Sequence, residues 1–347
     1  MNKFSAIIAD IVEPAIATKK NLGVVIAVIQ ADCASVCGFG QINGTEKIPG
    51  GTTIYEIGSV TKVFTSTLLA CLVNEGTIKL DDSVCNFLSE LPQFPPAITL
   101  RHLATHTSGL PRLPKNLWRS VLKNFNNPYA AYTSKDLYAY LRKFKLTAKI
   151  GQFNYSNLGM GLLGQVLERI TQKPYEQLIK QYITHPLGLS DTCITLTDEQ
   201  QQRLAPGHTD NGKLTSNWDL PTLAGAGALR STGDDLLKFL DANIHTEISH
   251  LQQAFESCHT MQIPEKSSND KSFISGGLGW FIVRLNESED PILWHNGATG
   301  GYQSYLGLIK GRCLGIVVLA NHGIGNTDRA FADVLGDRIF TALLARV

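Results

Sequence analysis

The chain has 347 residues, which is enough to bury a large core as one two-lobed domain or as two domains. Its hydrophobic content of 43% and charged content of 18% are ordinary for a soluble globular protein. A net charge of +1 gives no electrostatic reason to expect nucleic acid or an anionic membrane surface as a partner.

The seven cysteines are odd in number and scattered, and no two of them form a Cys-x-x-Cys pair. Neither a zinc site nor a disulfide framework is therefore indicated, and we expect no metal or organic cofactor. Cys33 and Cys37 lie near each other on a predicted hairpin, where we interpret them as buried small residues.

The start of the chain does not resemble an export signal. The apolar run before Asp10 has only four residues, too few for the hydrophobic region of a signal peptide. No stretch approaches the roughly 20 apolar residues of a membrane span. We therefore expect a cytoplasmic protein, or a periplasmic one if a leader was removed from this sequence.

The first elements predicted along the chain are a helix, several strands and a second helix. Residues 4–17 form an amphipathic pattern interrupted by Pro14, which predicts a helix. Two strands, a strand-like run and an apolar helix that ends at Gly76 follow, over residues 24–30, 35–42, 53–58 and 59–76.

The middle of the chain is helical, whereas its end is rich in strands. Helices are predicted over 158–170 and from Asp234, within a region of helices and loops from about residue 77 to 270. After Gly276 come four strands and a final helix, over residues 280–285, 292–295, 302–309, 313–320 and 328–345. Short turns between the late strands favour antiparallel pairing.

These elements predict an α/β (α+β) fold in which both chain ends build one mainly antiparallel sheet flanked by helices. Residues 1–76 and 275–347 would form the sheet lobe, and residues 77–274 an inserted, mainly helical lobe. Because clefts between lobes commonly hold active sites, we expect the site to lie between them.

Ser59-Val60-Thr61-Lys62 stands where the strand-like run turns into the apolar helix. Helix positions three apart have Cβ atoms ~5–6 Å apart, so the Lys62 amine can reach the Ser59 hydroxyl. Serine is a poor nucleophile at neutral pH and needs such a base. A helix N-terminus also favours developing negative charge. The alternative is that Ser59 only caps the helix.

The Ser-x-x-Lys spacing occurs twice more, so the spacing alone is not specific. Ser268 lies in a polar loop that has nothing to hold a catalytic geometry. Ser120 lies in a segment that indicates a solvated face because it is basic, with Arg112, Lys115, Arg119 and Lys123. The strand before Ser59 and the buried helix after it distinguish this copy from the other two.

Tyr155-Ser156-Asn157 lies in a polar turn just before the helix predicted over 158–170. A tyrosinate or polarised Tyr155 hydroxyl would act as general base and later as acid if nearby cations lower its pKa. The Asn157 amide offers a donor and an acceptor to a substrate amide. Alternatively, Asn157 caps the helix and Tyr155 packs on the surface.

His295-Asn296-Gly297-Ala298 comes at the end of a predicted strand. Gly297 would let a substrate lie against the strand edge, because no side chain intervenes. The N–H of Ala298, together with that of Ser59, would form an oxyanion hole. Alternatively, the segment is a glycine-rich hairpin turn with an incidental histidine.

Ser-x-x-Lys, Tyr-x-Asn and His-x-Gly occur in this order and in fitting structural settings. Over most of its length the chain therefore resembles the class C β-lactamase and D-Ala-D-Ala peptidase family of penicillin-binding serine hydrolases. The segments 55–82, 100–111 and 227–236 also look typical of that family. The resemblance implies a fold of the β-lactamase/transpeptidase type. It also makes His102 and His106 structural, although their helical spacing would otherwise suggest zinc.

The resemblance implies roles for the residues of the three motifs. Ser59 resembles the acylated nucleophile, Lys62 its activating base and Tyr155 the proton shuttle. Asn157 looks like the residue that holds the substrate amide, and the amides of Ser59 and Ala298 match the oxyanion hole.

The chain departs from the β-lactamase pattern in the third motif and in one loop. His295 stands where β-lactamases generally carry lysine, whereas D-Ala-D-Ala peptidases, D-amino-acid peptidases and some esterases of the family carry histidine. Because histidine is only partly protonated near pH 7, His295 would hold a substrate carboxylate less firmly. Asn296 replaces the usual hydroxyl residue, and the loop after Pro111 lacks the glutamine that contacts the substrate side chain in β-lactamases.

We therefore predict a serine hydrolase that cleaves an amide or ester, of the β-lactam or D-amino-acid peptide type, through an acyl-enzyme on Ser59. The expected partner is a small-molecule or short-peptide substrate, with neither nucleic acid nor a membrane span. A carboxylesterase or acyltransferase on the same fold is the alternative. The alternative of another class is a catalytically silent ligand-binding module.

Overall fold

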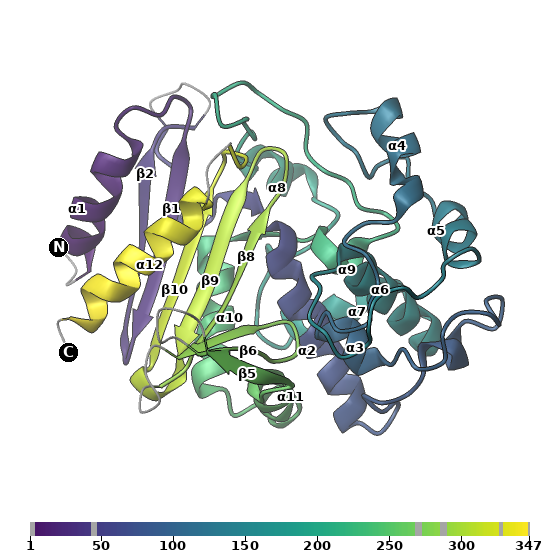
Figure 1. The fold of residues 1–347 in the computed structure, drawn as a ribbon. Helices are drawn as coiled ribbons and strands as arrows, with labels where there is room; N and C mark the ends of the chain where they lie inside the picture. Colours follow the sequence, from purple (N-terminus) through teal and green to yellow (C-terminus); the bar gives the residue numbers. More distant parts are fainter. Residues whose placement is uncertain (1–3, 43–46, 268–272, 285–289, 326–328, 346–347) are drawn as a thin grey trace.

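An eight-stranded antiparallel sheet forms the centre of the computed structural model, which describes residues 4–42, 47–267, 273–284, 290–325 and 329–345 (Figure 1). The strand order is β2-β1-β10-β9-β8-β7-β6-β5. The strands are β1 Gly23–Gln30, β2 Cys33–Gly40, β5 Ile263–Ser267, β6 Phe273–Gly276, β7 Phe281–Arg284, β8 Ile292–Ala298, β9 Gln303–Ile309 and β10 Leu314–Ala320. The prediction of an antiparallel sheet built from both chain ends is confirmed, because β1 pairs with β10 and Val24 lies opposite Ala320.

Helices cover both faces of this sheet. Helices α1 (Ser5–Ile16) and α12 (Phe331–Leu344) pack together on one face, and α10 (Gly233–His245) packs on the other (Figure 1). Alternate residues of β1 belong to two different apolar clusters, with Val24, Ile26 and Val28 on the side of α1 and α12. Val25, Ala27 and Ile29 belong to the larger cluster on the opposite side. The strand is therefore continuously apolar because both of its faces are buried.

The helical lobe lies between the early strands and the late ones in the sequence. Its core helices are α2 (Thr61–Asn74), which contacts α11 (Ser249–His259), and α6 (Asn157–Thr171), which contacts α9 (Ala224–Gly227). The other α-helices are α3 Leu100–Ala104, α4 Trp118–Lys123, α5 Ser134–Leu141, α7 Tyr175–Ile179 and α8 Asp198–Arg203. Short 3₁₀ or π turns lie at Gly58–Val60 (η1), Val84–Phe87, Lys115–Leu117, Lys180–Thr184 and Lys310–Arg312. In the described part of the chain no helix is long and apolar enough to cross a bilayer.

The sheet begins earlier in the sequence than expected. Strand β5 and the first two residues of β6 precede residue 275 and join the sheet at its edge, although the sequence placed them in the helical lobe. Strand β5 contains Pro264, and its pairing with β6 shifts between Ile263 and Lys266. Proline is tolerated in an edge strand because one side of that strand needs no ladder hydrogen bond. A second correction concerns Pro14, since α1 continues through this residue without interruption.

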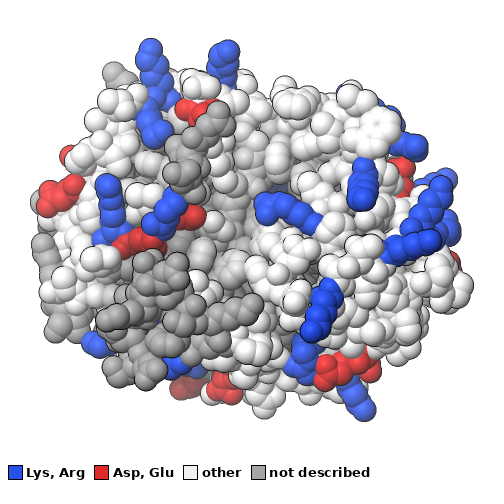
Figure 2. All heavy atoms as spheres, viewed as in Figure 1, with Lys and Arg blue, Asp and Glu red and all other residues white. Residues whose placement is uncertain are grey.

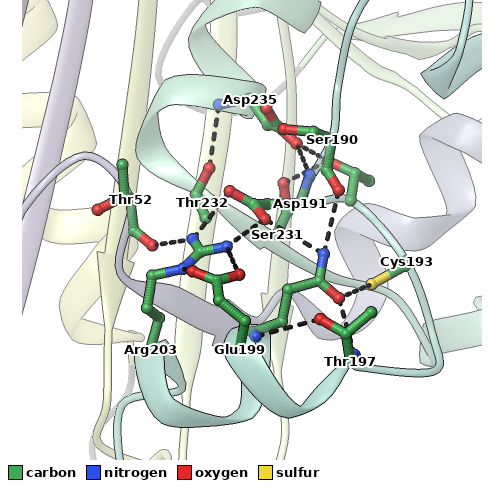
Figure 3. A network of polar contacts seen from close by, with 12 residues as sticks. Thr52, Ser190, Asp191, Cys193, Thr197, Glu199, Arg203, Ser231, Thr232 and Asp235 are labelled. Carbon is green, nitrogen blue, oxygen red and sulfur yellow. Dashed lines mark hydrogen bonds and ion pairs between the residues drawn. The ribbon is translucent and has the colours of Figure 1, made fainter.

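A polar network holds the strand that leads to Ser59 (Figure 3). Strand β3 (Ile54–Glu56) pairs with β4 (Arg230–Thr232) in a separate two-stranded sheet. Just before β3, the Thr52 carbonyl accepts a hydrogen bond of 2.8 Å from Arg203, whose guanidinium also pairs with Asp191 and Glu199 at 2.6 Å. The Asp191 N–H in turn donates to Asp235 of α10, at 2.7 Å. The network therefore links β3 to α8 and α10.

Two glycines allow η1 and β8 to approach closely, which brings Ser59 against the sheet. Gly58 has a φ of +47°, and a Cβ built on it would lie 2.7 Å from the amide nitrogen of Ala298. A Cβ built on Gly297 would lie 2.0 Å from the Ile57 carbonyl oxygen and 2.9 Å from the Ser59 nitrogen. Only glycine fits at these two positions without a shift of the backbone.

We expect the substitution Gly297→Ala to lower the free energy of unfolding by about 1–3 kcal/mol, because the added methyl group overpacks a backbone contact. Thermal unfolding followed by circular dichroism measures this change. Gly50→Ala is the matched control, because a Cβ at Gly50 meets no atom within 4 Å. Equal melting temperatures for the two variants would contradict the proposed close approach.

Candidate active site

Ser59 lies in the middle of η1, directly after β3 and directly before α2. The prediction that Ser59 lies at the start of the long apolar helix is therefore confirmed. The alternative, in which Ser59 caps that helix, is wrong. The N-cap residue of η1 is Ile57 and that of α2 is Val60, and neither element has a side-chain cap. The half-buried Ser59 side chain is thus available for other contacts.

Lys62 is completely buried and lies beside the Ser59 hydroxyl. Its Nζ is 2.8 Å from Ser59 Oγ and donates a hydrogen bond of 2.7 Å to the Ala226 carbonyl. Burial, with a smaller effect of the nearby Arg112 guanidinium, holds the pKa of the Lys62 amine well below its usual value. This arrangement favours a neutral amine, which can accept the proton of Ser59.

Tyr155 lies over the same amine, with Lys62 Nζ 5.0 Å from the centroid of its ring. Burial raises the pKa of the Tyr155 hydroxyl to about 12, although a hydrogen bond with Ser59 and the charge of Arg112 act in the opposite direction. The condition set for Tyr155 as a general base, that nearby cations lower this pKa, is therefore not met. Tyr155 keeps its proton at neutral pH, because the cost of burying a phenolate exceeds the attraction of the cations.

Asn157 is the first residue of α6, and it does not cap that helix. The cap is Ser156, whose hydroxyl accepts a hydrogen bond of 2.8 Å from the N–H of Gly159. The backbone N–H of Asn157 donates to the Arg112 carbonyl at 3.0 Å. Its side-chain Oδ1 is buried and has no hydrogen-bond partner in the described part of the chain. This oxygen is available to a substrate N–H.

His295 is buried in β8, close to Tyr155, and it is neutral. Its Nδ1 lies 2.6 Å from the Asn296 carbonyl oxygen, and its Nε2 has no partner among the described residues. Burial, followed by the nearby Lys62, lowers the pKa of His295 to about 3. The expectation of partial protonation near pH 7 is therefore wrong. The adjacent Asn296 side chain points elsewhere, since it donates to Asp333 of α12 at 2.8 Å.

The three motifs meet at one pocket. Its lining includes residues from all three, together with two aromatic residues, namely Ser59, Tyr129, Asn157, Trp218, Ala298 and Thr299. The rings of Tyr129 and Trp218 have centroids 5.3 Å apart. The face in Figure 2 is hollowed between the sheet and the helical lobe, and most of the surface there is uncharged. The sequence did not indicate the two aromatic residues as part of the site.

His106 also belongs to the site, although the sequence assigned it only a structural role. Its ring packs on Tyr155, with centroids 4.4 Å apart, and its Nδ1 accepts a hydrogen bond of 3.1 Å from the Ser156 N–H. His102 instead contacts Thr99 in a capping box at the start of α3. The two histidines therefore serve different segments. In the described part of the chain no group of three metal-ligating residues is present.

Of the two other Ser-x-x-Lys copies, the one that begins at Ser120 falls within the described residues and lies away from Ser59. Ser120 belongs to α4, and its hydroxyl is buried without a hydrogen-bond partner among the described residues, so its side chain is not part of a solvated face. Ser268 lies outside the described residues. All seven cysteines are free thiols. The interpretation of Cys33 as a buried residue is wrong, because its side chain is exposed.

Comparisons with known proteins agree with this architecture. The structure matches that of a class C beta lactamase from Rhodobacter sphaeroides with a TM-score of 0.83, at 23% identity, over 98% of this chain and 100% of the other. It matches the Beta-Lactamase/D-Alanine Carboxypeptidase from Pseudomonas syringae with a TM-score of 0.82, at 21% identity, over 97% and 98% of the two chains. The fold is therefore that of the class C β-lactamases.

Curated relatives and a family model extend this result to the sequence. The D-alanyl-D-alanine-carboxypeptidase/endopeptidase AmpH of Escherichia coli (strain K12) is 27% identical over 344 residues, which cover 91% of this chain and 84% of that protein. A Beta-lactamase of Pseudomonas fluorescens is 26% identical over 355 residues, covering 94% and 96% of the two chains. The model of the Beta-lactamase family matches residues 8–339. The chain therefore belongs to the beta-lactamase family.

Proposed function

We propose that the protein is a serine hydrolase that cleaves an amide or ester, of the β-lactam or D-amino-acid peptide type, through an acyl-enzyme on Ser59. One observation carries this proposal. The buried Lys62 amine lies 2.8 Å from Ser59 Oγ in surroundings that favour its neutral form. A nucleophile with an adjacent, unprotonated base is the requirement for attack by serine at neutral pH.

In the acylation step, Lys62 accepts the Ser59 proton while Oγ attacks the substrate carbonyl carbon. The N–H groups of Ser59 and Ala298 stabilise the oxyanion that forms, since the close approach of η1 and β8 places them together. The tetrahedral intermediate then expels the amine or alkoxide. Tyr155 donates its proton to this leaving group and recovers one from the Lys62 ammonium.

In the deacylation step, a water molecule attacks the acyl carbon. Its proton passes to Lys62, directly or through Tyr155, and Lys62 then returns this proton to Ser59 Oγ as the C–Oγ bond breaks and the acid is released. Asn157 Oδ1, which is free to accept a hydrogen bond, holds an N–H of the acyl group during both steps. The cycle regenerates Ser59 and needs no change in the protonation of His295.

The substrate types are those in the names of the relatives. AmpH of E. coli is a D-alanyl-D-alanine-carboxypeptidase/endopeptidase, and the P. fluorescens relative is a Beta-lactamase. Both classes of substrate present an acyl carbonyl to a serine nucleophile. The expectation that Gly297 leaves room for a substrate is wrong, because its Cβ direction is already filled by the Ile57 carbonyl oxygen; the missing side chain instead lets the Ser59 N–H approach β8.

An ester substrate is the second candidate, and His295 favours it. A neutral, buried imidazole offers no positive charge to a carboxylate on the leaving group. An ester with an uncharged alcohol needs no such charge. A silent ligand-binding module would have no need of a buried lysine beside Ser59, because burying an amine costs free energy unless a function requires it.

The first prediction concerns covalent acylation. We expect intact-mass spectrometry to detect one added penicilloyl group after mixing with benzylpenicillin, and none in the Ser59→Ala variant. Ser120→Ala is the matched control, because it removes the other described Ser-x-x-Lys serine, and it should still be acylated. Acylation of Ser59→Ala would contradict the proposal. Labelling by a fluorophosphonate but not by penicillin would favour the ester, and labelling by neither would favour the silent module.

The second prediction concerns pH. Protonation of Lys62 removes the base, so kcat/KM should rise with pH through the lowered pKa of this amine and then reach a plateau. Because the pKa of Tyr155 is about 12, no descending limb should occur below pH 10. Hydrolysis of a 4-nitrophenyl ester over pH 5–10 measures the profile. A fall in kcat/KM between pH 7 and 9 would contradict this prediction. It would indicate that Tyr155 loses its proton in this range and that the enzyme with the phenolate is inactive.

The third prediction concerns the base itself. Lys62→Met fills a similar volume without an amine, and we expect kcat to fall by about 10²–10⁴. The substitution should not lower the melting temperature, because the buried polar group is replaced by an apolar one. Parallel thermal unfolding distinguishes a lost base from a lost fold. A variant that keeps parental kcat would exclude Lys62 as the base.

A further inference from the structure

Arg112 places a guanidinium at the entrance of the site. The side chain is exposed, and its Cζ lies 5.1 Å from the centroid of the Tyr155 ring. The Arg112 carbonyl accepts hydrogen bonds from the N–H groups of Asn157 and Leu158, at 3.0 and 3.2 Å. The loop that carries the guanidinium is therefore fastened to the start of α6, beside two of the motif residues.

Among the residues that the structure describes, this guanidinium has no carboxylate partner. Its side chain forms neither an ion pair nor a hydrogen bond with them. Glu56, which accepts a hydrogen bond from the Trp218 N–H, and Asp219 lie 3.7 and 3.5 Å from Arg230 instead. Arg112 thus keeps a positive charge that no described side chain neutralises.

In the other basic groups of the site, burial favours the neutral form. Burial lowers the pKa of Lys62, His106 and His295. The charge of Arg112 contributes to the lowered pKa of Lys62 and of His106, and it opposes the raised pKa of Tyr129. The charge of this exposed side chain therefore affects the pKa of three groups of the site.

The position of Arg112 distinguishes the two ends of a substrate. Tyr129 and Asn157, the residues next to Arg112, line the pocket that opens beside Ser59. The N–H of Asn157, the residue proposed to hold an N–H of the acyl group, donates to the Arg112 carbonyl, so Arg112 belongs to the acyl side of the site. His295, whose ring centroid lies 6.3 Å from that of Tyr155, is neutral. Lys62 Nζ and Arg112 Cζ lie 5.0 and 5.1 Å from the same ring centroid, so their separation cannot exceed the sum of these distances, a span that one small substrate can bridge.

We propose that Arg112 binds an anionic group, a carboxylate, on the acyl part of the substrate. The preferred acyl donor then carries a negative charge a short chain away from the carbonyl that Ser59 attacks. A guanidinium suits this task because its fork of N–H donors matches the two oxygens of a carboxylate. This inference rests on the proposed acyl-enzyme at Ser59 and adds the substrate's charge and its location.

Three esters separate the possibilities. The neutral reference is 4-nitrophenyl pentanoate, and mono-4-nitrophenyl glutarate adds a carboxylate to the acyl chain. In 4-(pentanoyloxy)benzoate the carboxylate is on the leaving group. The readout is the ratio of kcat/KM for each anionic ester to that for the neutral one. The ratio is needed because Arg112 also affects the pKa of Lys62, so absolute rates of all three esters will change together.

We expect Arg112→Gln to lower the glutarate ratio about tenfold, the size of effect typical of a charge-assisted pair. Arg112→Lys should restore part of the ratio, and 0.5 M NaCl should lower it in the parent protein. Arg119→Gln is the matched control, because Arg119 also lies over an aromatic ring, that of Trp118 at 5.6 Å, but belongs to α4. This control should leave every ratio unchanged.

The outcomes that overturn the inference are distinct. Turnover with an unchanged glutarate ratio in Arg112→Gln would exclude Arg112 as the anion-binding residue and leave the proposed hydrolase intact. A loss confined to 4-(pentanoyloxy)benzoate would place the anion on the leaving group instead. If the parent protein hydrolyses none of the esters and Ser59 reacts with no serine reagent, the proposed function is wrong and this inference fails with it.

Discussion

The burial of the Lys62 amine is the constraint on which the rest of the site depends. An ammonium group in this position would lose its hydration without a carboxylate to replace it, so the interior favours the neutral base. The contacts of the amine come from three separate parts of the chain, namely η1, α9 and the turn before α6. Lys62 therefore becomes buried beside Ser59 only when α9 and the turn before α6 have packed against α2.

The same exclusion of water determines the charge of the neighbouring groups. Tyr155 keeps its proton, and the rings of His106 and His295 remain neutral, because each ionised form would be poorly solvated. Proton transfers within the site thus begin from an uncharged ground state. In the reaction that we propose, negative charge would develop only on the substrate oxygen, next to the backbone N–H groups of η1 and β8, where preorganised dipoles stabilise such charge most effectively.

Much of the fold was predictable from the sequence, because β1, β9 and β10 are apolar runs of strand length between clear turns. The edge strand with Pro264 was not, since its conformation comes from pairing with β6 rather than from its own pattern. The Ser59–Lys62 contact was predictable because it is local to one helical turn. The protonation of Tyr155 and His295 was not, because burial depends on segments far apart in the sequence.

The pairing of β1 with β10 has a consequence for biosynthesis. Val24 is translated long before its partner Ala320, and the centre of the sheet cannot form until β10 has left the ribosome. Closing so long a loop also makes folding slow. Until then the apolar faces of β1 remain uncovered, a state in which chains associate readily. A nascent chain of this protein should accordingly depend on chaperones until β10 is available.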